Sequence, residues 1–316
     1  MMDKNYKILV TGATGYIGAH VVKALSERGH VVTGTDCDDK QNDISKYAEF
    51  IYWDIDFNDV NVRFLKALSM LEERSYDKII HLAARTKVPN SVANPLKYYT
   101  TNVLGTSHVT SIPCDHFIYC STGSAFDPVA NPYAGSKYAG ELITKQFYPN
   151  NHSIVRFYNV SGNDGMLKYD DDVSHLIRKA ARVANSILHN SLDCNAILNY
   201  KIAESEVMNV YGTDYDTRDG TCIRNYTHIT DIVNGIINIV EAEPTNKIEC
   251  LGSPDGTSVK EVIDTMNRVS GVELNQKVMP RREGDVAISV VPEDSPFFTQ
   301  TKTLDDMCID ALEVEK

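Results

Sequence analysis

Short β-rich segments alternate with amphipathic helical segments through the first half of this chain, and this alternation constrains the fold more than any other feature. Apolar and β-branched runs predict strands at residues 7–10, 31–35, 50–52, 78–82, 117–121 and 153–158. Apolar side chains at three- and four-residue spacing predict helices over residues 18–28, 60–73, 96–110 and 136–146. Strands separated by helices pair in parallel through right-handed crossovers, so we expect an α/β fold with a doubly wound parallel sheet.

The alternation ends after about residue 160, which predicts a second and smaller lobe. Its predicted elements are a strand at 247–251 and helices at 173–188, 229–241 and 258–270, the last of them opened by a Ser258 cap. We expect residues 1–162 to form the sheet domain, with residues 225–252 packing back on it. Residues 163–316 would form the C-terminal lobe and hold the ligand contacts that decide specificity.

The composition excludes several classes of partner. The 316 residues carry a net charge of -12 and no run of five or six basic residues, so nucleic acid and anionic membrane surfaces are poor partners. Seven cysteines without a C-x-x-C pair argue against a disulfide framework and a zinc site, and we expect no metal. No apolar run approaches the roughly 18 residues that span a bilayer, and the early first strand leaves no room for a signal peptide. We therefore expect a soluble, cytoplasmic protein.

A glycine-rich segment, TGATGYIG at residues 11–18, joins the first strand to the first helix. Its three glycines are Gly12, Gly15 and Gly18. They would let the backbone turn tightly, approach a pyrophosphate and pack the helix on the strand. The N-terminus of the helix that follows would present free N–H groups and the positive end of its dipole to the phosphates, and Tyr16 and Ile17 are also predicted cofactor contacts. The G-x-x-G-x-x-G spacing differs from the commonest fingerprint, G-x-G-x-x-G, but its place between strand and helix predicts dinucleotide binding.

Asp36 follows the second strand, 18 residues after Gly18, where its carboxylate could accept hydrogen bonds from both hydroxyls of a ribose. A 2′-phosphate would be repelled by Asp36 and by the nearby Asp38 and Asp39, and no arginine lies in the glycine-rich turn or just after Asp36. These residues favour NAD over NADP as the cofactor. The alternative for Asp36 is an ordinary solvated acid in a turn.

Residues after two other strands complete the predicted cofactor site. Asp54 and Ile55 after the third strand could bracket an adenine edge. His81 ends the fourth strand, and we expect it to be a buried structural residue. The next three residues are Leu82, Ala83 and Ala84. The small side chains of this segment would let a cofactor come close to the backbone.

Tyr133 and Lys137 are four residues apart in a predicted helix, so their phenol and ammonium would lie on one face. A free tyrosine has a pKa of about 10, and a fixed cation beside it would lower that pKa toward a useful value for a general base. Such a pair is also common on an exposed helix, which is the alternative. Thr122 or Ser121 at the end of the fifth strand could place a hydroxyl beside the phenol. Ligands bind at the carboxyl ends of parallel strands, so this location favours a catalytic pair.

These motifs resemble those of the extended short-chain dehydrogenase/reductase family, which contains NAD-dependent epimerases and dehydratases. The resemblance rests on the glycine-rich turn, on Thr122 with Tyr133-x-x-x-Lys137, and on the segments HLAA (81–84), NVLGT (102–106) and RFYN (156–159). The UDP-glucose 4-epimerase subgroup is matched by the segments YGTDYDTRDGTCIRNYTH (211–228), RREGD (281–285) and TLDDMCID (303–310). The match covers nearly the whole chain.

The resemblance implies a Rossmann domain and an isomerase that interconverts UDP-glucose and UDP-galactose through a 4-keto intermediate, with NAD as cofactor. Tyr133 would take the proton of the sugar's 4-hydroxyl as hydride passes to NAD, and Thr122 would hydrogen-bond the reacting oxygen. Lys137 would lower the pKa of Tyr133 and hold the nicotinamide ribose. Tyr133 and Lys137 are therefore also predicted cofactor contacts.

The resemblance also implies the UDP contacts and an oligomeric state. The expected contacts of the UDP-sugar are Asn159, Tyr211, Arg224, Arg282 and, on the uridine ribose, Asp285. Two guanidinium groups suit a pyrophosphate because arginine is always charged and can donate two parallel hydrogen bonds. Family members commonly dimerise through helices that correspond to residues 96–110 and 136–146, so we expect a homodimer.

Three departures from the family pattern leave the substrate open. Only ten residues separate Thr122 from Tyr133, where relatives carry a longer segment, and the stretch after Asp285 is also shorter. Ser289 stands where bacterial glucose-type enzymes usually have a bulky tyrosine, and a small side chain there would admit an N-acetyl group at C2. The alternatives are a UDP-N-acetylglucosamine 4-epimerase, an enzyme that accepts both sugars, or a non-catalytic protein that binds NAD or a sugar nucleotide. A 4,6-dehydratase would need an acid where this chain has Gly123.

Overall fold

The computed structural model describes residues 5–37, 44–56, 62–164, 175–192, 207–282 and 285–314, and the chain divides into two units. The first unit contains Met1–Phe157, Val233–Leu251 and Ser295–Phe298. The second unit contains Tyr158–Ile232, Gly252–Asp294 and Thr299–Lys316. The boundary after residue 162, the return of residues 225–252 and the roles given to the two parts stay predictions.

A seven-stranded sheet runs through the first unit, with the strand order β11-β6-β5-β4-β1-β2-β3. Its strands are β1 (Lys7–Thr11), β2 (Val31–Asp36), β3 (Glu49–Tyr52), β4 (Tyr76–His81), β5 (Cys114–Thr122), β6 (His152–Phe157) and β11 (Ile248–Cys250). All neighbouring strands in it are parallel. The predicted α/β fold with a doubly wound parallel sheet is confirmed, and each strand predicted in the first half overlaps an observed one.

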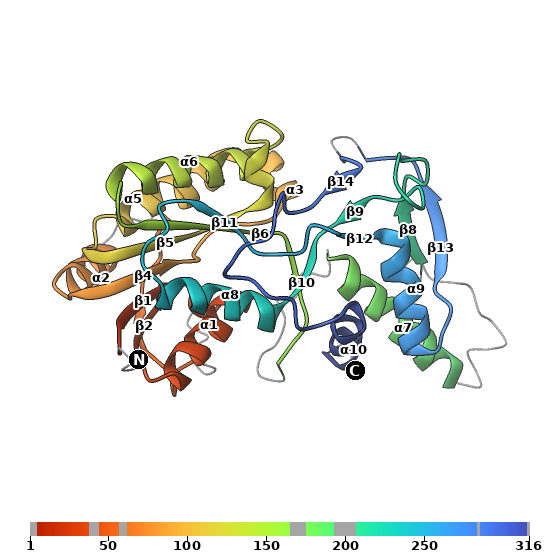
Figure 1. Ribbon diagram of the computed structural model, residues 1–316, viewed down its shortest axis with the longest axis horizontal. Coiled ribbons are helices and arrows are strands. Elements are labelled where there is room, and N and C mark those ends of the chain that lie inside the picture. The colour runs from red at the N-terminus through yellow and green to blue at the C-terminus, as the bar shows by residue number, and fades with distance from the viewer. Residues whose placement is uncertain are drawn as a thin grey trace. The chain divides into compact units, whose positions relative to one another are not determined.

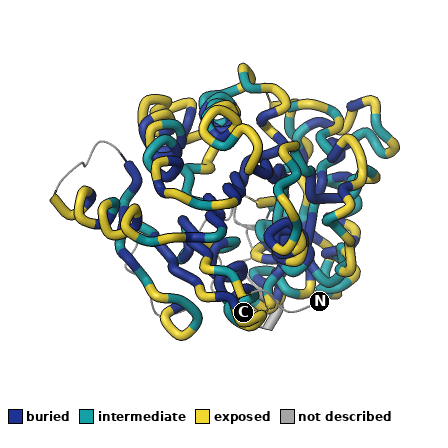
Figure 2. The backbone as a smooth tube through the Cα atoms, turned by 60° about the vertical axis from the view of Figure 1, so that its left-hand side comes forward, coloured by how far each residue is buried: buried dark blue, intermediate teal, exposed yellow. Residues whose placement is uncertain are grey.

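Helices cover both faces of this sheet (Figure 1). One face carries α1 (Tyr16–Glu27) and α8 (Ile229–Glu241), and the other carries α2 (Val62–Glu72), α5 (Gly105–Val109) and α6 (Pro132–Phe147). An ion pair of 2.8 Å between Arg28 Nη1 and Glu241 Oε1 joins the ends of α1 and α8. Buried and exposed residues alternate along the helices, as Figure 2 shows, because each helix packs one side on a core and turns the other to solvent.

The chain is helical where a helix is predicted over residues 96–110, but it is not one regular α-helix. The chain there forms α4 (Pro95–Tyr99), a π-helical turn (Thr100–Leu104) and α5, preceded by α3 (Val88–Ala93). In the π-helical turn, the buried Asn102 side chain donates from Nδ2 to the Arg85 carbonyl at 3.0 Å and to Ser136 Oγ at 2.9 Å. These tertiary hydrogen bonds accompany the local change of helical pitch, and apolar periodicity cannot predict them.

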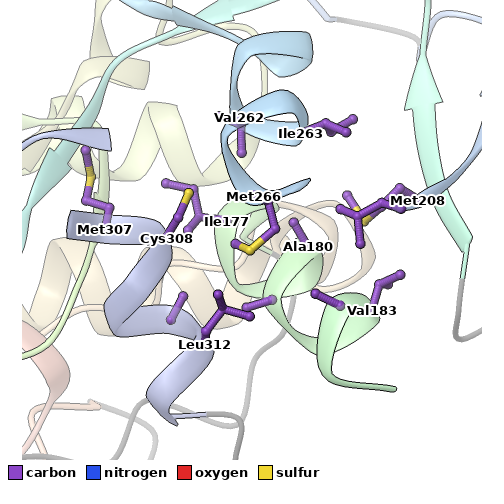
Figure 3. Close-up of a cluster of buried hydrophobic side chains, with 14 of the residues drawn as sticks. Ile177, Ala180, Val183, Met208, Val262, Ile263, Met266, Met307, Cys308 and Leu312 are labelled. Atoms are coloured by element: carbon purple, nitrogen blue, oxygen red, sulfur yellow. The ribbon is translucent and has the colours of Figure 1, made fainter. Parts of the chain in front are cut away.

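Small sheets and helices form the second unit. β7 (Asn159–Ser161) pairs with β10 (Tyr226–His228), β8 (Val207–Tyr211) pairs with β13 (Asn275–Met279), and β9 (Ile223–Arg224) pairs with β12 (Thr257–Ser258) and β14 (Ile288–Ser289). The helices described here are α7 (Leu176–Leu192), α9 (Val259–Ser270) and α10 (Leu304–Val314). Side chains from all of these helices meet Met208 of β8 in one buried cluster (Figure 3). This cluster is the core of the second unit.

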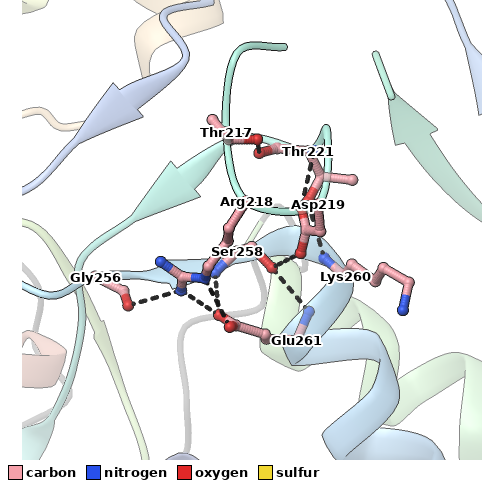
Figure 4. A network of polar contacts seen from close by, with 8 residues as sticks. All are labelled: Thr217, Arg218, Asp219, Thr221, Gly256, Ser258, Lys260 and Glu261. Carbon is pink, nitrogen blue, oxygen red and sulfur yellow. Dashed lines mark hydrogen bonds and ion pairs between the residues drawn. The ribbon is translucent and has the colours of Figure 1, made fainter. Parts of the chain in front are cut away.

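The N-terminus of α9 is capped by serine, as the sequence predicts. Ser258 Oγ accepts from the Glu261 N–H at 3.0 Å, and the Glu261 carboxylate accepts from the Ser258 N–H at 2.8 Å, which is a capping box. The Ser258 hydroxyl also donates to Asp219, and Arg218 donates to Glu261 (Figure 4). The cap thus ties the polar segment around Asp219 to α9.

Ser258→Ala should lower the free energy of unfolding by about 1–2 kcal/mol, because the variant loses the N-cap and the donor to Asp219. Urea unfolding followed by circular dichroism would measure the change. Ser270→Ala at the other end of α9 is the control, since its hydroxyl donates to the Met266 carbonyl of the same helix. Equal losses in the two variants would contradict the special role of the cap.

Candidate active site

The glycine-rich turn between β1 and α1 is so crowded at Gly12 and Gly18 that only glycine fits there. Gly12 has a φ of +71°, and a Cβ built there would lie 2.7 Å from the Ala83 backbone nitrogen. A Cβ on Gly18 would lie 2.0 Å from the Gly12 carbonyl oxygen. The turn therefore holds α1 close to β1 and to the segment after β4, as a dinucleotide-binding turn requires.

The N-terminus of α1 is open to a ligand. Gly15 is the N-cap and has no side chain, so no side-chain hydrogen bond caps the helix. Tyr16 and Ile17 follow as the first helical residues, and both are half-buried. Their turn presents backbone N–H groups and the positive end of the helix dipole, which suits a phosphate.

Asp36 ends β2 beside the same turn. Its carboxylate accepts from the Thr14 N–H at 3.0 Å and from the Cys37 N–H at 2.7 Å. These bonds orient the carboxylate at the carboxyl end of β2, where it can accept from the hydroxyls of a ribose. The neighbouring Asp38 and Asp39 lie outside the described residues.

Asp54 and Ile55, the residues predicted to bracket an adenine, differ in exposure. Asp54 is half-buried and accepts from the Asp56 N–H at 3.0 Å. Ile55 is buried in the core of the first unit, and a Cβ on Gly105 would lie 2.9 Å from its Cδ1. The Ile55 side chain therefore has a packing role, whatever its backbone contacts.

His81 at the end of β4 is a structural residue, as expected. Its Nδ1 accepts from Thr11 Oγ1 at 2.7 Å, and its Nε2 lies 2.9 Å from Thr106 Oγ1. Because the Thr106 hydroxyl donates to the Asn102 carbonyl at 2.6 Å, Nε2 of His81 must carry the proton. Burial, helped by the Lys137 charge, lowers the pKa of His81 to about 3, so the ring is neutral.

The backbone after His81 lies against the glycine-rich turn. The Leu82 N–H donates to the Thr11 carbonyl and the Ala83 N–H to Thr11 Oγ1, both at 3.2 Å. Leu82, Ala83 and Ala84 are all half-buried. The predicted cofactor residues of β1, β2 and β4 are therefore neighbours in the first unit.

α6 carries Tyr133 and Lys137 on adjacent turns, and its start is set by local sequence. Asn131 is the N-cap, whose Oδ1 accepts from the Ala134 N–H at 2.9 Å. Pro132 takes the first helical position, where its missing N–H does no harm. This cap fixes where the helix begins and hence the places of Tyr133 and Lys137.

Lys137 is buried and held against β5. Its Nζ donates to the Cys120 carbonyl at 2.7 Å and lies 4.3 Å from the centroid of the Tyr119 ring. Burial lowers the pKa of Lys137 to about 8, so most of the amine is still protonated at neutral pH. The first unit thus contains a fixed buried cation at the carboxyl end of the sheet.

Thr122 ends β5 and caps the 3-10 turn η4 (Gly123–Phe126) by accepting from the Ser124 N–H at 3.3 Å. Burial raises the pKa of Tyr133 above 10.0, and a hydrogen bond with Thr122 opposes this effect in part. Tyr98 acts in the same direction as burial, and its ring stands edge-on to Tyr133 at 6.5 Å. The lowering of this pKa predicted from Lys137 is not found: burial raises the pKa, and Lys137, whose Nζ donates to the Cys120 carbonyl, is not among the groups that shift it.

Asn102 and Ser136 also belong to this arrangement, although the sequence did not identify them as site residues. Ser136 Oγ donates to the Tyr133 carbonyl at 2.8 Å and accepts from Asn102 Nδ2. Asn102 Oδ1 accepts from the Arg85 N–H at 2.8 Å. Through Asn102, Thr106 and His81, buried hydrogen bonds connect α6 with the glycine-rich turn. The only sequence signal for Asn102 is its place in the NVLGT segment.

In the second unit, four predicted UDP contacts form two pairs. Arg224 Nη2 lies 3.5 Å from Asp285 Oδ1. The guanidinium carbon of Arg282 lies 3.8 Å from the centroid of the Tyr211 ring. Burial raises the pKa of Tyr226, and the charges of Arg224 and Arg282 both oppose the rise, so both guanidiniums are near one phenol.

The fifth predicted contact, Asn159, lies in β7 of the same unit. Its Nδ2 donates to the Asn225 carbonyl at 2.9 Å. The neighbouring Arg281 is engaged elsewhere, because its Nε donates to Asp214 Oδ1 at 2.9 Å and its guanidinium stacks on Tyr215. Of the two adjacent arginines, Arg282 is therefore better placed to receive an anion.

Three further properties describe the residues that the structure covers. No three His, Cys, Asp or Glu side chains gather among them as a metal ion would require. The described helices include none with the length and apolar character needed to cross a bilayer. Six cysteines in the described ranges are free thiols.

Acid should destabilise the first unit through His81 and His116. Burial, helped by Lys78, lowers the pKa of His116 to about 3, and both rings are held neutral by hydrogen bonds. In the unfolded chain each ring takes up a proton below its ordinary pKa of 6.5, whereas the folded rings do not. Stability is therefore lost as the pH falls from 6.5 toward 3, by about 1.4 kcal/mol per ring between pH 7.5 and 5.5.

Urea unfolding at pH 7.5 and pH 5.5 would test this expectation. His116→Gln should reduce the difference in unfolding free energy between the two pH values. His189→Gln is the control, because His189 is exposed, and it should leave that difference unchanged. An undiminished difference in His116→Gln would remove His116 from the explanation.

Known proteins resemble this chain over most of its length. Residues 8–250 match the model of the NAD dependent epimerase/dehydratase family. A UDP-glucose 4-epimerase of Halalkalibacterium halodurans is 30% identical over 307 residues, which cover 89% of this chain and 85% of that protein.

Solved structures give the same picture. The UDP-glucose 4-epimerase from Brucella ovis in complex with NAD is 26% identical, with a TM-score of 0.80 and 98% of each chain covered. The UDP-Glc/GlcNAc 4-epimerase from the human pathogen Campylobacter jejuni is 27% identical, with a TM-score of 0.74 and the same coverage. The similarity therefore extends over both units of the chain.

Proposed function

The chain belongs to the NAD dependent epimerase/dehydratase family, and we propose that it interconverts UDP-glucose and UDP-galactose by inverting C4 of the hexose. The observation that carries this proposal is the group formed by Thr122, Tyr133 and Lys137 at the carboxyl end of the parallel sheet. A hydroxyl, a phenol and a buried ammonium can move one proton to and from an alcohol. The open N-terminus of α1 in the same unit supports a dinucleotide as the redox partner.

The residues of the first unit fit NAD. The backbone N–H groups at the N-terminus of α1, which has no side-chain cap, would bind the pyrophosphate, Asp36 the adenosine ribose, and Lys137 the nicotinamide ribose. When bound, NAD would supply the hydride acceptor that oxidises the C4 alcohol and the hydride donor that reduces the ketone. The Asp36 carboxylate would repel a 2′-phosphate, which favours NAD over NADP.

Tyr133 would take the proton of the 4-hydroxyl and return it after the 4-keto sugar has presented its other face. Its half-buried phenol has a pKa above the ordinary value, which favours the protonated form, so it would keep the proton until the return step. The removal step needs the phenolate, and the Thr122 hydroxyl stabilises that form through its hydrogen bond. The Lys137 ammonium would add a fixed positive charge to the same site.

The second unit would supply the UDP contacts. Arg224 and Arg282 would neutralise the diphosphate, and Tyr211 would orient the Arg282 guanidinium that stacks on it. Asn159 would contribute an amide, and Asp285 would accept from the uridine ribose. The ion pair of Arg224 with Asp285 supports a shared place for these two groups.

A second candidate substrate is the N-acetylhexosamine version, UDP-N-acetylglucosamine, either alone or beside UDP-glucose. Two observations favour it. Ser289 of β14 is small, and its carbonyl accepts at 3.1 Å from the N–H of Asn225, the residue whose own carbonyl accepts from Asn159. The Campylobacter jejuni relative is itself a UDP-Glc/GlcNAc 4-epimerase.

We also propose that the protein is a homodimer and acts in the cytoplasm. Large apolar side chains are exposed on the helices expected to mediate dimerisation, among them Leu96, Tyr99, Leu104, Leu142 and Phe147. Exposed apolar surface of this kind is typical of an interface. The free thiols in the described ranges are consistent with a reducing compartment. Light scattering at micromolar concentration would test the dimer, which Leu96→Glu with Leu142→Glu should disrupt.

One experiment tests the proposed reaction directly. The purified protein with NAD is incubated with UDP-galactose and, separately, with UDP-N-acetylgalactosamine, and the C4 epimers are followed by proton NMR. Conversion of the first alone gives the glucose-type enzyme, and conversion of both gives the dual enzyme. Failure to convert either sugar nucleotide would contradict the proposed activity.

A further inference from the structure

Glu141 and Arg156 form a buried ion pair one helical turn from Lys137. The proposed reaction gives this pair no role. Glu141 of α6 accepts from Nε and Nη2 of Arg156 in β6, both at 2.7 Å, and from the Ser121 hydroxyl at 2.5 Å. Glu141 is 0% exposed and Arg156 is 3% exposed. Apolar residues of similar volume often stabilise a fold equally well, so such a pair invites an explanation beyond stability.

The ion pair joins the elements that carry the catalytic group. Ser121 and Arg156 are register partners on β5 and β6, and Ser121 immediately precedes Thr122. Glu141 follows Lys137 by four residues on α6, so the two side chains share one helix face. The end of β5 is therefore fixed against α6 at the place where both contribute to the site.

Arg156 also contacts η4, the turn that follows Thr122. Its Nη2 donates to the Ala125 carbonyl at 3.4 Å, and its guanidinium carbon lies 4.3 Å from the centroid of the Phe126 ring. Within η4, the Ser124 N–H donates to Thr122 Oγ1 at 3.3 Å. The guanidinium thus holds the turn, and the turn holds the Thr122 hydroxyl.

The short link between Thr122 and Tyr133 makes the contacts of Arg156 with η4 more important. Ten residues form the link, and two of its apolar side chains have little packing, with Phe126 55% exposed and Val129 91% exposed. Within η4 itself only Ala125 packs an apolar side chain in the core, so a further contact from the core helps to hold the turn in one conformation. Arg156 provides such a contact from β6.

We propose that Arg156 is a positioning residue for the epimerisation: held by Glu141, it anchors η4 and keeps the Thr122 hydroxyl on the Tyr133 phenol. The kinetic consequence rests on the proposed function. The structural statement, that Arg156 acts on Tyr133 through Thr122, can be tested without turnover. Arg156 itself is not assigned any contact with substrate or cofactor.

Arg156→Lys is the main variant, because lysine keeps the charge that Glu141 needs but lacks the planar face and the forked donors. Arg74→Lys is the matched control, since Arg74 makes a similar forked pair with Glu49, at 2.6 and 2.8 Å, elsewhere in the first unit. Phe126→Ala with Leu65→Ala as its control gives a second pair of exposed sites, 55% and 56% exposed, that should fold normally.

The first readout is the titration of Tyr133 in the NAD-loaded protein, followed by NMR of ¹³Cζ-labelled tyrosine and assigned with Tyr133→Phe. The Thr122 hydrogen bond lowers the pKa of Tyr133, so its loss should raise the midpoint by about half a pH unit or more in Arg156→Lys. Phe126→Ala should shift the midpoint in the same direction, and neither control should move it. An unchanged midpoint in both Arg156→Lys and Phe126→Ala would overturn the proposal.

The second readout is a double-mutant cycle with Thr122→Val. Arg156→Lys should lower kcat for the sugar nucleotide roughly 10- to 100-fold with little change in KM, because a small misplacement of a reacting group is costly. In the Thr122→Val background the same change should cost no more than about twofold. Fully additive effects would show that Arg156 does not act through Thr122. If the wild-type protein converts no UDP-sugar, the proposed function fails, and the titration still decides the role of Arg156.

Discussion

Replacing Tyr133 with phenylalanine should lower kcat for C4 epimerisation by about 10²- to 10⁴-fold, the usual contribution of a general acid–base group. The variant keeps the aromatic ring beside Tyr98 but has no proton to exchange with the sugar. NAD affinity should change by no more than a few-fold, since the open N-terminus of α1 and Asp36 are untouched. Initial rates from a coupled assay, with NAD binding followed by fluorescence titration, would measure both quantities.

Tyr138→Phe is the matched control for this experiment. Tyr138 lies on the same helix, is 36% exposed and has no predicted role, so its variant should keep the wild-type kcat. A Tyr133→Phe enzyme with full activity would require another proton carrier. Loss of NAD binding together with activity would instead indicate that Tyr133 is mainly a cofactor contact.

Gly18→Ala should raise the dissociation constant for NAD by about 100-fold or more and also lower the melting temperature. A Cβ at this position would lie 2.0 Å from the Gly12 carbonyl oxygen, so α1 must move away from the turn. Overpacking of this kind costs about 1–3 kcal/mol or more, and about 1.4 kcal/mol corresponds to a tenfold loss of affinity. Isothermal titration with NAD and thermal unfolding by circular dichroism would measure the two effects.

Gly15→Ala separates the two effects of the glycine-rich turn. Gly15 has a φ of -71°, and a new Cβ would lie 3.3 Å from the Gly12 carbonyl oxygen, so alanine requires a shift of only a few tenths of an ångström, far less than at Gly18. The added methyl would lie at the uncapped helix end, where the pyrophosphate is expected, so NAD binding should still weaken. Normal NAD affinity in Gly15→Ala would mean that the phosphates do not approach this turn.

The sequence predicted the sheet of the first unit well, because its strands are dense in β-branched residues and its crossovers follow a strong handedness rule. The Gly12 turn and the Tyr133–Lys137 spacing were also visible, since both depend on residues that are close in sequence. The helical segment over residues 96–110 was predicted as one regular helix. Its π-helical turn was missed because the hydrogen bonds of Asn102 that accompany it are made with residues distant in sequence, Arg85 and Ser136.

Other features depend on tertiary structure and could not be predicted. The described strands of the second unit contain only two to five residues each, which is too short for a periodic signal. The raised pKa of Tyr133 reflects burial, and burial of a helical tyrosine cannot be read from its neighbours in sequence. The Glu141–Arg156 pair joins residues from α6 and β6, and no local motif connects them.

The strand order of the first unit has a consequence for synthesis of the chain. Its edge strand β11 pairs with β6, yet the chain leaves β6 at Phe157 and reaches β11 only at Ile248, after residues of the second unit. During translation, β6 therefore remains an open sheet edge until roughly 90 further residues have left the ribosome. A nascent chain stalled in that interval exposes a strand that can pair with another molecule. Slower translation of residues 158–247 would lengthen the exposure, so it should increase aggregation during expression even when the mature protein is stable.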